Sequence, residues 1–162
     1  MRERTIASHF VRAALRGADR RGLACDLILR QAGIQSAVLV EPRARIAPEQ
    51  FALLMQLLWE ALDDEYLGFG RQPSKRGTFA MMGHAIIHCR SLEKALSRGA
   101  MFYGLFPDAP SISLQREGDW ARLSVDDSPL WDPDHFLVES LLVIWHRLGS
   151  WLIGQRIRLE EA

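Results

Sequence analysis

The sequence has little cysteine and no excess of either charge, and each of these features excludes a class of protein. Cys25 and Cys89 are its two cysteines, too few for a disulfide framework, so reduced thiols in a cytoplasmic protein are the simpler interpretation. Lys plus Arg equals Asp plus Glu, 20 residues each. A protein that binds DNA by itself usually has a basic surplus, because phosphate neutralisation dominates its affinity. The neutral charge therefore argues against self-sufficient DNA binding.

Long apolar runs and catalytic motifs are also missing. The longest apolar candidate, residues 136–154, is interrupted by Glu139, His146 and Arg147, so no stretch resembles a membrane span of roughly 20 apolar residues. The N-terminus lacks the apolar core of a signal peptide. No phosphate-binding loop and no G-x-S-x-G nucleophile elbow occurs. We expect a cytoplasmic protein without membrane contact, cofactor or catalytic residues.

What is present is an ordinary globular composition with helical periodicity. Hydrophobic residues make up 48% and charged residues 25% of the 162 residues, enough for one domain with a sizeable core. Apolar spacing predicts two helices over about 5–18 and 23–32, and a third that begins at Pro48. A further helix is predicted from Thr78 to near Cys89, and the next begins after an N-terminal cap at Ser91. Gly33 stands where a left-handed C-terminal cap is expected, with Ile34 folding back.

A β-hairpin is predicted near residues 111–126. Apolar and polar residues alternate in "SISLQRE" and "WARLSVD", and Gly118-Asp119 joins the two segments. Asp132 as a cap and Pro133 at the first position then open a long apolar helix, and "QRIRLEEA" is a candidate further strand. The pattern predicts a single α+β domain over residues 1–162, mostly helical, with a small antiparallel sheet.

Four arginines on the first predicted helix and its end could meet phosphate: Arg12, Arg16, Arg20 and Arg21. A charge run on a helix is usually a solvated face, and that is the expectation here. A contact with another domain or chain is the alternative.

His84 and His88 lie four residues apart, a spacing that places two metal ligands on one face of a helix. A catalytic zinc site would want a glutamate after the first histidine, and Ala85 stands there instead. A structural site needs four ligands, and no further cluster supplies them. We therefore expect no metal site, and the two histidines are candidates for the wall of a pocket. A metal or haem sensor remains the alternative.

The aromatic and methionine residues are plentiful around this segment. Most such residues belong to the core, yet an apolar pocket with a few polar groups is the usual form of a small-molecule site. The predicted effector pocket consists of Phe79, Met81, His84, His88, Phe102, Tyr103 and Trp145.

The order of these elements resembles the N-terminal effector-binding domain of AraC-type bacterial transcription regulators, in the branch related to the ornithine-utilisation regulator. The resemblance rests on "LILRQAGI", on "RIAPEQFALLMQLLWEALDDEYLGFGRQ" and above all on "GTFAMMGHAIIHCRSLEKAL". In that last segment the family shows two glycines, an apolar helix and a Ser/Thr-Leu cap. The corresponding residues are Gly77, Gly83, Ser91, Leu92, Ala95 and Leu96.

The resemblance implies a sensor domain of a larger protein. A small-molecule effector of unknown identity would bind it, and DNA would be bound only by a C-terminal domain of two helix-turn-helix units, which lies outside this chain. In that family the position of His84 is commonly another residue, often aromatic, which favours the pocket wall over a metal. We expect an effector-binding and dimerising domain, with a homodimer as a candidate assembly. A purely structural oligomerisation domain, using exposed apolar residues of the 136–152 helix, is a further alternative.

Overall fold

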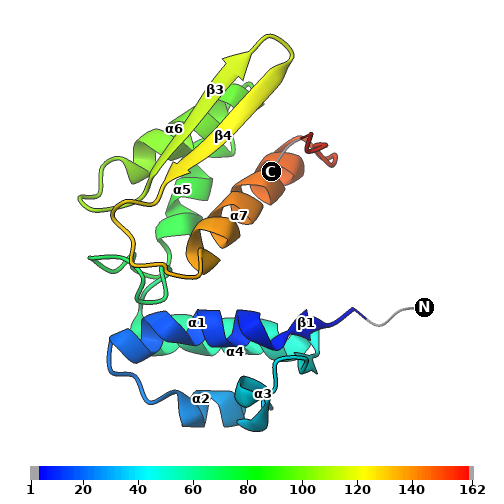
Figure 1. Cartoon of the computed structure of the whole chain (residues 1–162). Helices are drawn as coiled ribbons and strands as arrows, with labels where there is room; N and C mark the ends of the chain where they lie inside the picture. The colour runs from blue at the N-terminus through cyan, green and yellow to red at the C-terminus, as the bar shows by residue number, and fades with distance from the viewer. Residues whose placement is uncertain (1–3, 161–162) are drawn as a thin grey trace. The chain divides into compact units, whose positions relative to one another are not determined.

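The computed structural model describes residues 4–160, and its elements confirm the α+β class (Figure 1). Within this range seven helices accompany two antiparallel sheets of two strands each. The elements are β1 (Ile6–Ala7), α1 (Ser8–Arg20), α2 (Cys25–Gln31), α3 (Ala37–Val40), β2 (Arg45–Ile46), α4 (Pro48–Leu62), α5 (Thr78–Ile86), α6 (Leu92–Tyr103), β3 (Ser111–Glu117), β4 (Trp120–Asp126) and α7 (Phe136–Leu152). None of these helices is long and apolar enough to cross a bilayer.

The described residues form two compact units. Unit 1 consists of residues up to 76 together with 131–136, and unit 2 consists of residues 77–130 and those from 137 onward. The chain therefore passes between the units after residues 76, 130 and 136.

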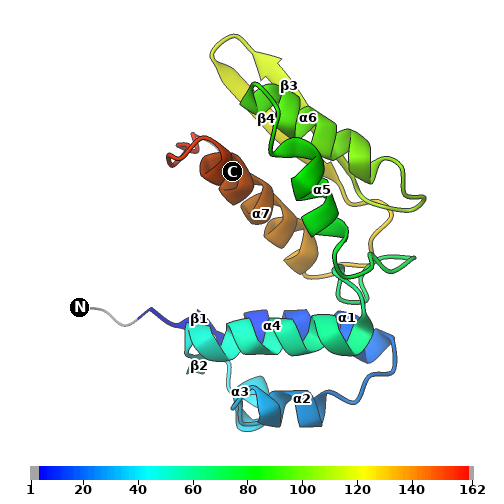
Figure 2. The ribbon, with the colours of Figure 1, turned by 180° about the vertical axis from the view of Figure 1, so that it is seen from behind.

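Unit 1 is built around α1, which packs against α2, α3 and α4 (Figure 2). Val11, Ala14 and Ala18 of α1 and Leu54 and Leu58 of α4 are completely buried. Their spacing of three and four residues puts each set on one face of its helix. The predicted apolar stripe of α4 is thus confirmed, as is Pro48 at its first position.

The first helix begins at Ser8 rather than at the predicted Thr5. Ile6 and Ala7 form β1 and pair with Ile46 and Arg45 of β2. The hydroxyl of Ser8 donates a hydrogen bond to the carbonyl of Glu41 over 3.0 Å, which fixes the entry to the helix. Helical periodicity could not reveal this start, because the competing partner is about 40 residues away in the sequence.

The end of α2 follows the predicted pattern. Gly33 adopts a φ of 68°, and the N–H of Ile34 donates to the carbonyl of Leu29 over 2.9 Å. The side chain of Gln50 donates to the Gly33 carbonyl and accepts the N–H of Ala47. This amide therefore links the end of α2 to the start of α4.

Three of the four arginines, Arg16, Arg20 and Arg21, are exposed as the prediction of a solvated face expects, but all four also contact groups of unit 1. Arg12 donates to the Ser8 hydroxyl over 3.0 Å, and Arg21 donates to the Gly70 carbonyl over 2.7 Å. Arg16 pairs with Asp134, and the guanidinium of Arg20 lies over the ring of Trp131. All four partners belong to unit 1, although most of them are distant in the sequence.

Unit 2 packs α6 against α5 and against β3. The hydroxyl of Ser91 accepts the N–H of Lys94, which confirms the predicted N-terminal cap of α6. The hairpin is also confirmed: its register runs from Ser111 opposite Asp126 to Glu117 opposite Trp120. Gly118 begins the two-residue turn with a φ of 63°, a conformation that favours glycine.

Two predictions near the C-terminal helix were wrong. Helix α7 starts at Phe136, not at Pro133, because His135 has a φ of 54° and the Asp132 carboxylate caps the N–H of Phe136 over 2.9 Å. Residues 155–160 form no strand.

Those residues instead fold back along α7. The N–H of Ile157 donates to the Ser150 hydroxyl, and its carbonyl accepts from Nε2 of His146 over 3.0 Å. Residues 161–162 of the predicted strand lie outside the described range.

Candidate functional site

An aromatic cluster reaches from the interior of unit 2 to its surface and contains three of the predicted pocket residues. The ring of Tyr103 in α6 lies 6.2 Å from that of Trp145 in α7 and 5.7 Å from that of Phe102. Phe106, which the prediction omitted, lies 5.4 Å from Phe102. Trp145 is 1% exposed and Tyr103 is 6% exposed, so both are core residues as the structure stands.

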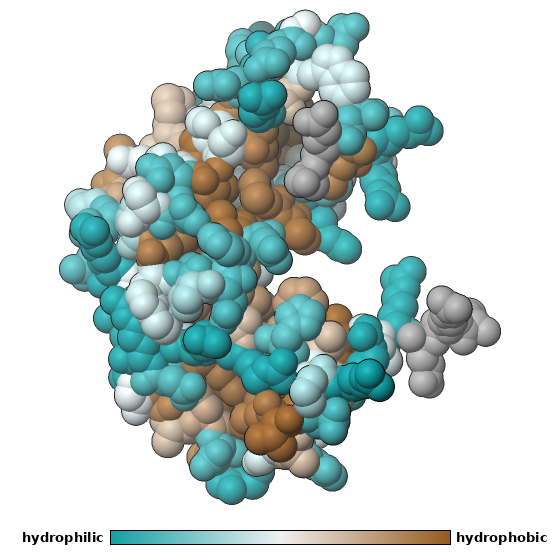
Figure 3. Space-filling model, in the orientation of Figure 1, coloured by the Kyte–Doolittle hydropathy of each residue, from teal (hydrophilic) through white to brown (hydrophobic). Residues whose placement is uncertain are grey.

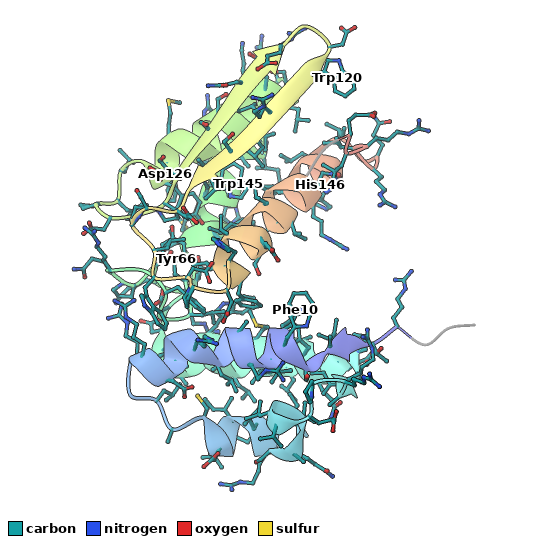
Figure 4. The ribbon with its side chains drawn as sticks, in the orientation of Figure 1. Phe10, Tyr66, Trp120, Asp126, Trp145 and His146 are labelled. Carbon is teal, nitrogen blue, oxygen red and sulfur yellow. The ribbon has the colours of Figure 1, made fainter. Side chains whose placement is uncertain are left out.

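Gly99 makes room for this cluster. A Cβ atom at Gly99 would lie 2.9 Å from the Trp145 ring and 3.1 Å from the sulfur of Met82, closer than a carbon atom tolerates. The indole of Trp145 therefore projects from α7 toward α5 and α6 within unit 2 (Figure 4). The sequence signal for this contact was a glycine inside a helical pattern, which usually has a packing reason.

The remaining predicted residues lie on α5 or just after it and are more exposed than Tyr103 and Trp145. Phe79 is half-buried in the first turn of α5. Met81 is 62% exposed, and His84 and His88 are exposed as well. The predicted set therefore ranges from buried Tyr103 and Trp145, through half-buried Phe79 and Phe102, to the exposed residues Met81, His84 and His88.

The histidine pair has no further ligands in the structure. Helix α5 ends at Ile86, so His88 lies beyond its last residue. Among residues 4–160, no group of three or more His, Cys, Asp or Glu side chains is placed to hold a metal ion. Two exposed imidazoles do not make the four-ligand set of a structural zinc site.

Two open depressions on the surface are lined by residues outside the predicted pocket. The first lies in unit 1 and is lined by Arg21, Gly22, Leu23, Ala61, Leu62, Asp64 and Pro73. The second lies in unit 2 and is lined by His146 and residues 156–160. Neither of these depressions reaches the buried rings of Tyr103 and Trp145.

A buried polar group in unit 1 is structural rather than reactive. The carboxylate of Asp64, which is 2% exposed, accepts the N–H groups of Tyr66, Gly68 and Ser74 over 2.8–2.9 Å. Burial raises the pKa of the Tyr66 phenol, so its hydroxyl stays protonated at neutral pH. Three donors on one carboxylate hold the loop after α4 in a fixed shape.

Cys25 is likewise unsuited to chemistry. Burial, with a smaller contribution from Asp19, raises the pKa of its thiol to about 12. The reactive form of a cysteine is the thiolate, so this thiol is inert near neutral pH.

Comparison with curated proteins and with solved structures found no match to this chain. A family model, the arabinose-binding domain of AraC transcription regulators, N-terminal, matches residues 22–162. That match covers most of unit 1 and the whole of unit 2. The chain therefore belongs to the family of N-terminal arabinose-binding domains of AraC transcription regulators.

Proposed function

We propose that this chain is the ligand-sensing domain of a transcription regulator, in the branch related to the ornithine-utilisation regulator. It binds a small-molecule effector and thereby controls a DNA-binding domain outside these residues. The observation that carries the proposal is the family match over residues 22–162. The balance of 20 basic and 20 acidic residues supports this proposal, because a neutral domain is a poor DNA binder and the DNA contacts would come from the other domain.

The effector binds in unit 2, against the predicted pocket residues. Support comes from the aromatic cluster of Phe102, Tyr103 and Trp145, which offers ring faces and a phenol to an apolar ligand with a polar group. Phe79, Met81, His84 and His88 lie on α5 or just after it, and α5 packs against α6.

Binding at this cluster requires a rearrangement. Tyr103 and Trp145 are almost fully buried, so a ligand that reaches them has to separate α7 from α6 at Gly99. Such a ligand binds a minor conformation in which α7 and α6 are apart. Its apparent affinity is lower because only a small fraction of molecules adopts that conformation.

A thermal-shift screen against amino acids, amines, sugars and fatty acids tests the proposal. A ligand at one hundred times its dissociation constant stabilises the fold by about 2.7 kcal/mol, which is a readily measured rise in melting temperature. Tyr103→Phe should weaken the effect, whereas Trp120→Ala at the hairpin tip, which is 59% exposed, should leave it unchanged. If no compound raises the melting temperature, the chain does not sense an effector of these four classes.

Helix α7 supports a second role, the formation of a homodimer. Apolar side chains lie exposed along it (Figure 3). They are Leu142, Val143, Ile144 and Trp151, which are 37%, 54%, 37% and 66% exposed. Ile144 and Trp151 are seven residues apart and so share one face of the helix.

A further inference from the structure

Six residues, Trp131–Phe136, lie in unit 1 although the chain on both sides of them belongs to unit 2. We call this segment the strap. It connects β4 to α7, and its last residue, Phe136, is also the first residue of α7. Whatever holds the strap on unit 1 therefore holds the start of α7 there as well.

Aromatic packing on Phe69 provides one part of the attachment. Phe69 is 1% exposed, and its ring lies 6.4 Å from that of Trp131 and 6.1 Å from that of Phe136. The N–H of Trp131 donates to the carbonyl of Phe69 over 2.8 Å. A single residue of unit 1 thus contacts both ends of the strap.

Two arginines of α1 provide the other part. Nε of Arg16 lies 2.6 Å from a carboxylate oxygen of Asp134. The guanidinium carbon of Arg20 lies 5.3 Å from the centroid of the Trp131 ring, within the range of a cation–π interaction. Arg16 and Arg20 are four residues apart, so one face of α1 presents both groups to the strap.

The surface that receives the strap is fixed, whereas the contacts on the strap are partly open to water. Asp64 and Arg21 form hydrogen bonds to the backbone of residues 66–70. Helix α1 approaches this backbone so closely at Gly17 that a Cβ atom there would lie 2.1 Å from the carbonyl oxygen of Leu67. By contrast, the side chains of Arg16 and Asp134 are 52% and 38% exposed, and Trp131 is 42% exposed. Phe136, at the end of the strap, is 5% exposed. Segments with more exposed contacts open locally at a lower free-energy cost, so the strap should open before the surface that it packs on.

We propose that the strap is a releasable connection: it detaches from Arg16, Arg20 and Phe69 while the rest of unit 1 stays folded. In the docked state the start of α7 is tied to unit 1. In the released state the link between β4 and α7 is longer and α7 is free to move. This rests on the proposed function, in which α7 separates from α6 when an effector binds.

Residue-resolved amide hydrogen exchange on the whole chain tests the strap without any effector. The amide of Trp131 reports release, because its acceptor is Phe69, whereas the amides of His135 and Phe136 are bonded within the strap to Asp132. In a variant with Arg16→Gln and Arg20→Gln we expect the Trp131 amide to exchange roughly fivefold faster or more. The His135 amide and the amides of α4 should change little.

Two controls keep the result interpretable. Asp134→Asn removes the ion pair from the strap side and should accelerate the Trp131 amide in the same direction, even if the double variant folds poorly. Arg12→Gln, on the same helix but bonded to Ser8 and Leu39, should leave the Trp131 amide unchanged. High salt should also accelerate it, by screening the ion pair.

Unchanged Trp131 exchange in the arginine and Asp134 variants overturns the proposal. Equal acceleration of the Trp131 and α4 amides overturns it too, because the arginines would then only stabilise unit 1 as a whole. A negative effector screen refutes sensing of the four screened classes but leaves this measurement intact, so the two failures are distinguishable.

Discussion

Gly17 is the residue on which the packing of α1 against residues 66–70 depends most directly. A Cβ atom at this position would lie 2.1 Å from the carbonyl oxygen of Leu67 and 2.9 Å from the ring of Phe69. Because the nearest atom is backbone, relief requires α1 or the loop to move. We predict that Gly17→Ala lowers the free energy of unfolding by about 2–4 kcal/mol, measured by urea denaturation.

Gly83→Ala is the matched control. Gly83 lies inside α5, and apart from its chain neighbours and the backbone of its own helix nothing lies within 4 Å of a Cβ there. Alanine is the better helix former by up to about 1 kcal/mol, so this variant should be neutral or more stable. Equal stability of Gly17→Ala and the wild type would contradict the close approach of α1 to Leu67.

The two cysteines should differ sharply in reactivity. Because the pKa of Cys25 is raised to about 12, about one molecule in ten thousand carries its thiolate at pH 8. Cys89 is only half-buried. We predict that a thiol reagent at pH 8 modifies Cys89 in the native protein and Cys25 only after denaturation. Rapid modification of both thiols in the native state would show that Cys25 is not enclosed.

The same shift predicts a pH dependence of stability. The unfolded chain releases the Cys25 proton near pH 9.0 and the folded chain near 12. Proton release therefore favours the unfolded state between these values, and the contribution of Cys25 to the free energy of unfolding falls as the pH rises through this window. Cys25→Ser should reduce this loss when unfolding is followed from pH 8 to 10.

Helix α6 depends on its cap. The Ser91 hydroxyl accepts the N–H of Lys94, which satisfies one of the backbone donors that the first turn leaves without a partner. We predict that Ser91→Ala costs about 1 kcal/mol of stability and that Ser91→Asp restores most of it. Thermal unfolding of the two variants is the measurement. If both variants lose the same stability, the cap does not contribute as proposed.

Local signals were sufficient for the elements that depend on their own residues. Gly33, Ser91 and the Gly118 turn each satisfy a backbone requirement within a few positions, so the sequence revealed them. The pairing of β1 with β2 and the docking of the strap depend on partners that are distant in the sequence. The return of Ile157 depends on Ser150 and His146, which lie beyond the range of a turn or cap. No local periodicity encodes those contacts.

The candidate site shows the same division. Tyr103 and Trp145 are predicted as pocket residues from the supply of aromatic side chains, and in the structure their rings lie 6.2 Å apart. Met81, His84 and His88 were included for their chemistry and spacing alone, and they lie exposed. Residue type indicates which side chains could contact a ligand, but tertiary packing decides which of them lie next to one another.

The assembly of the whole protein can be tested through α7. If the exposed apolar face of α7 forms a homodimer, Trp151→Glu should place a charge in the interface and shift the chain to a monomer in sedimentation experiments. Glu139→Gln, an exposed polar position on the same helix, is the control and should leave the dimer intact. A wild-type chain that sediments as a monomer at working concentration would rule out the dimer.

The strap also determines how this molecule could be recombined with its relatives. The residues that complete unit 1 come from two separate stretches, so an exchange at residue 76 would separate Phe69 from Trp131 and Phe136. A chimera that takes unit 1 from another family member therefore has to take the residues equivalent to 131–136 from that same donor. Because the strap packs on residues that are distant in the sequence, the two stretches of unit 1 have to be inherited together.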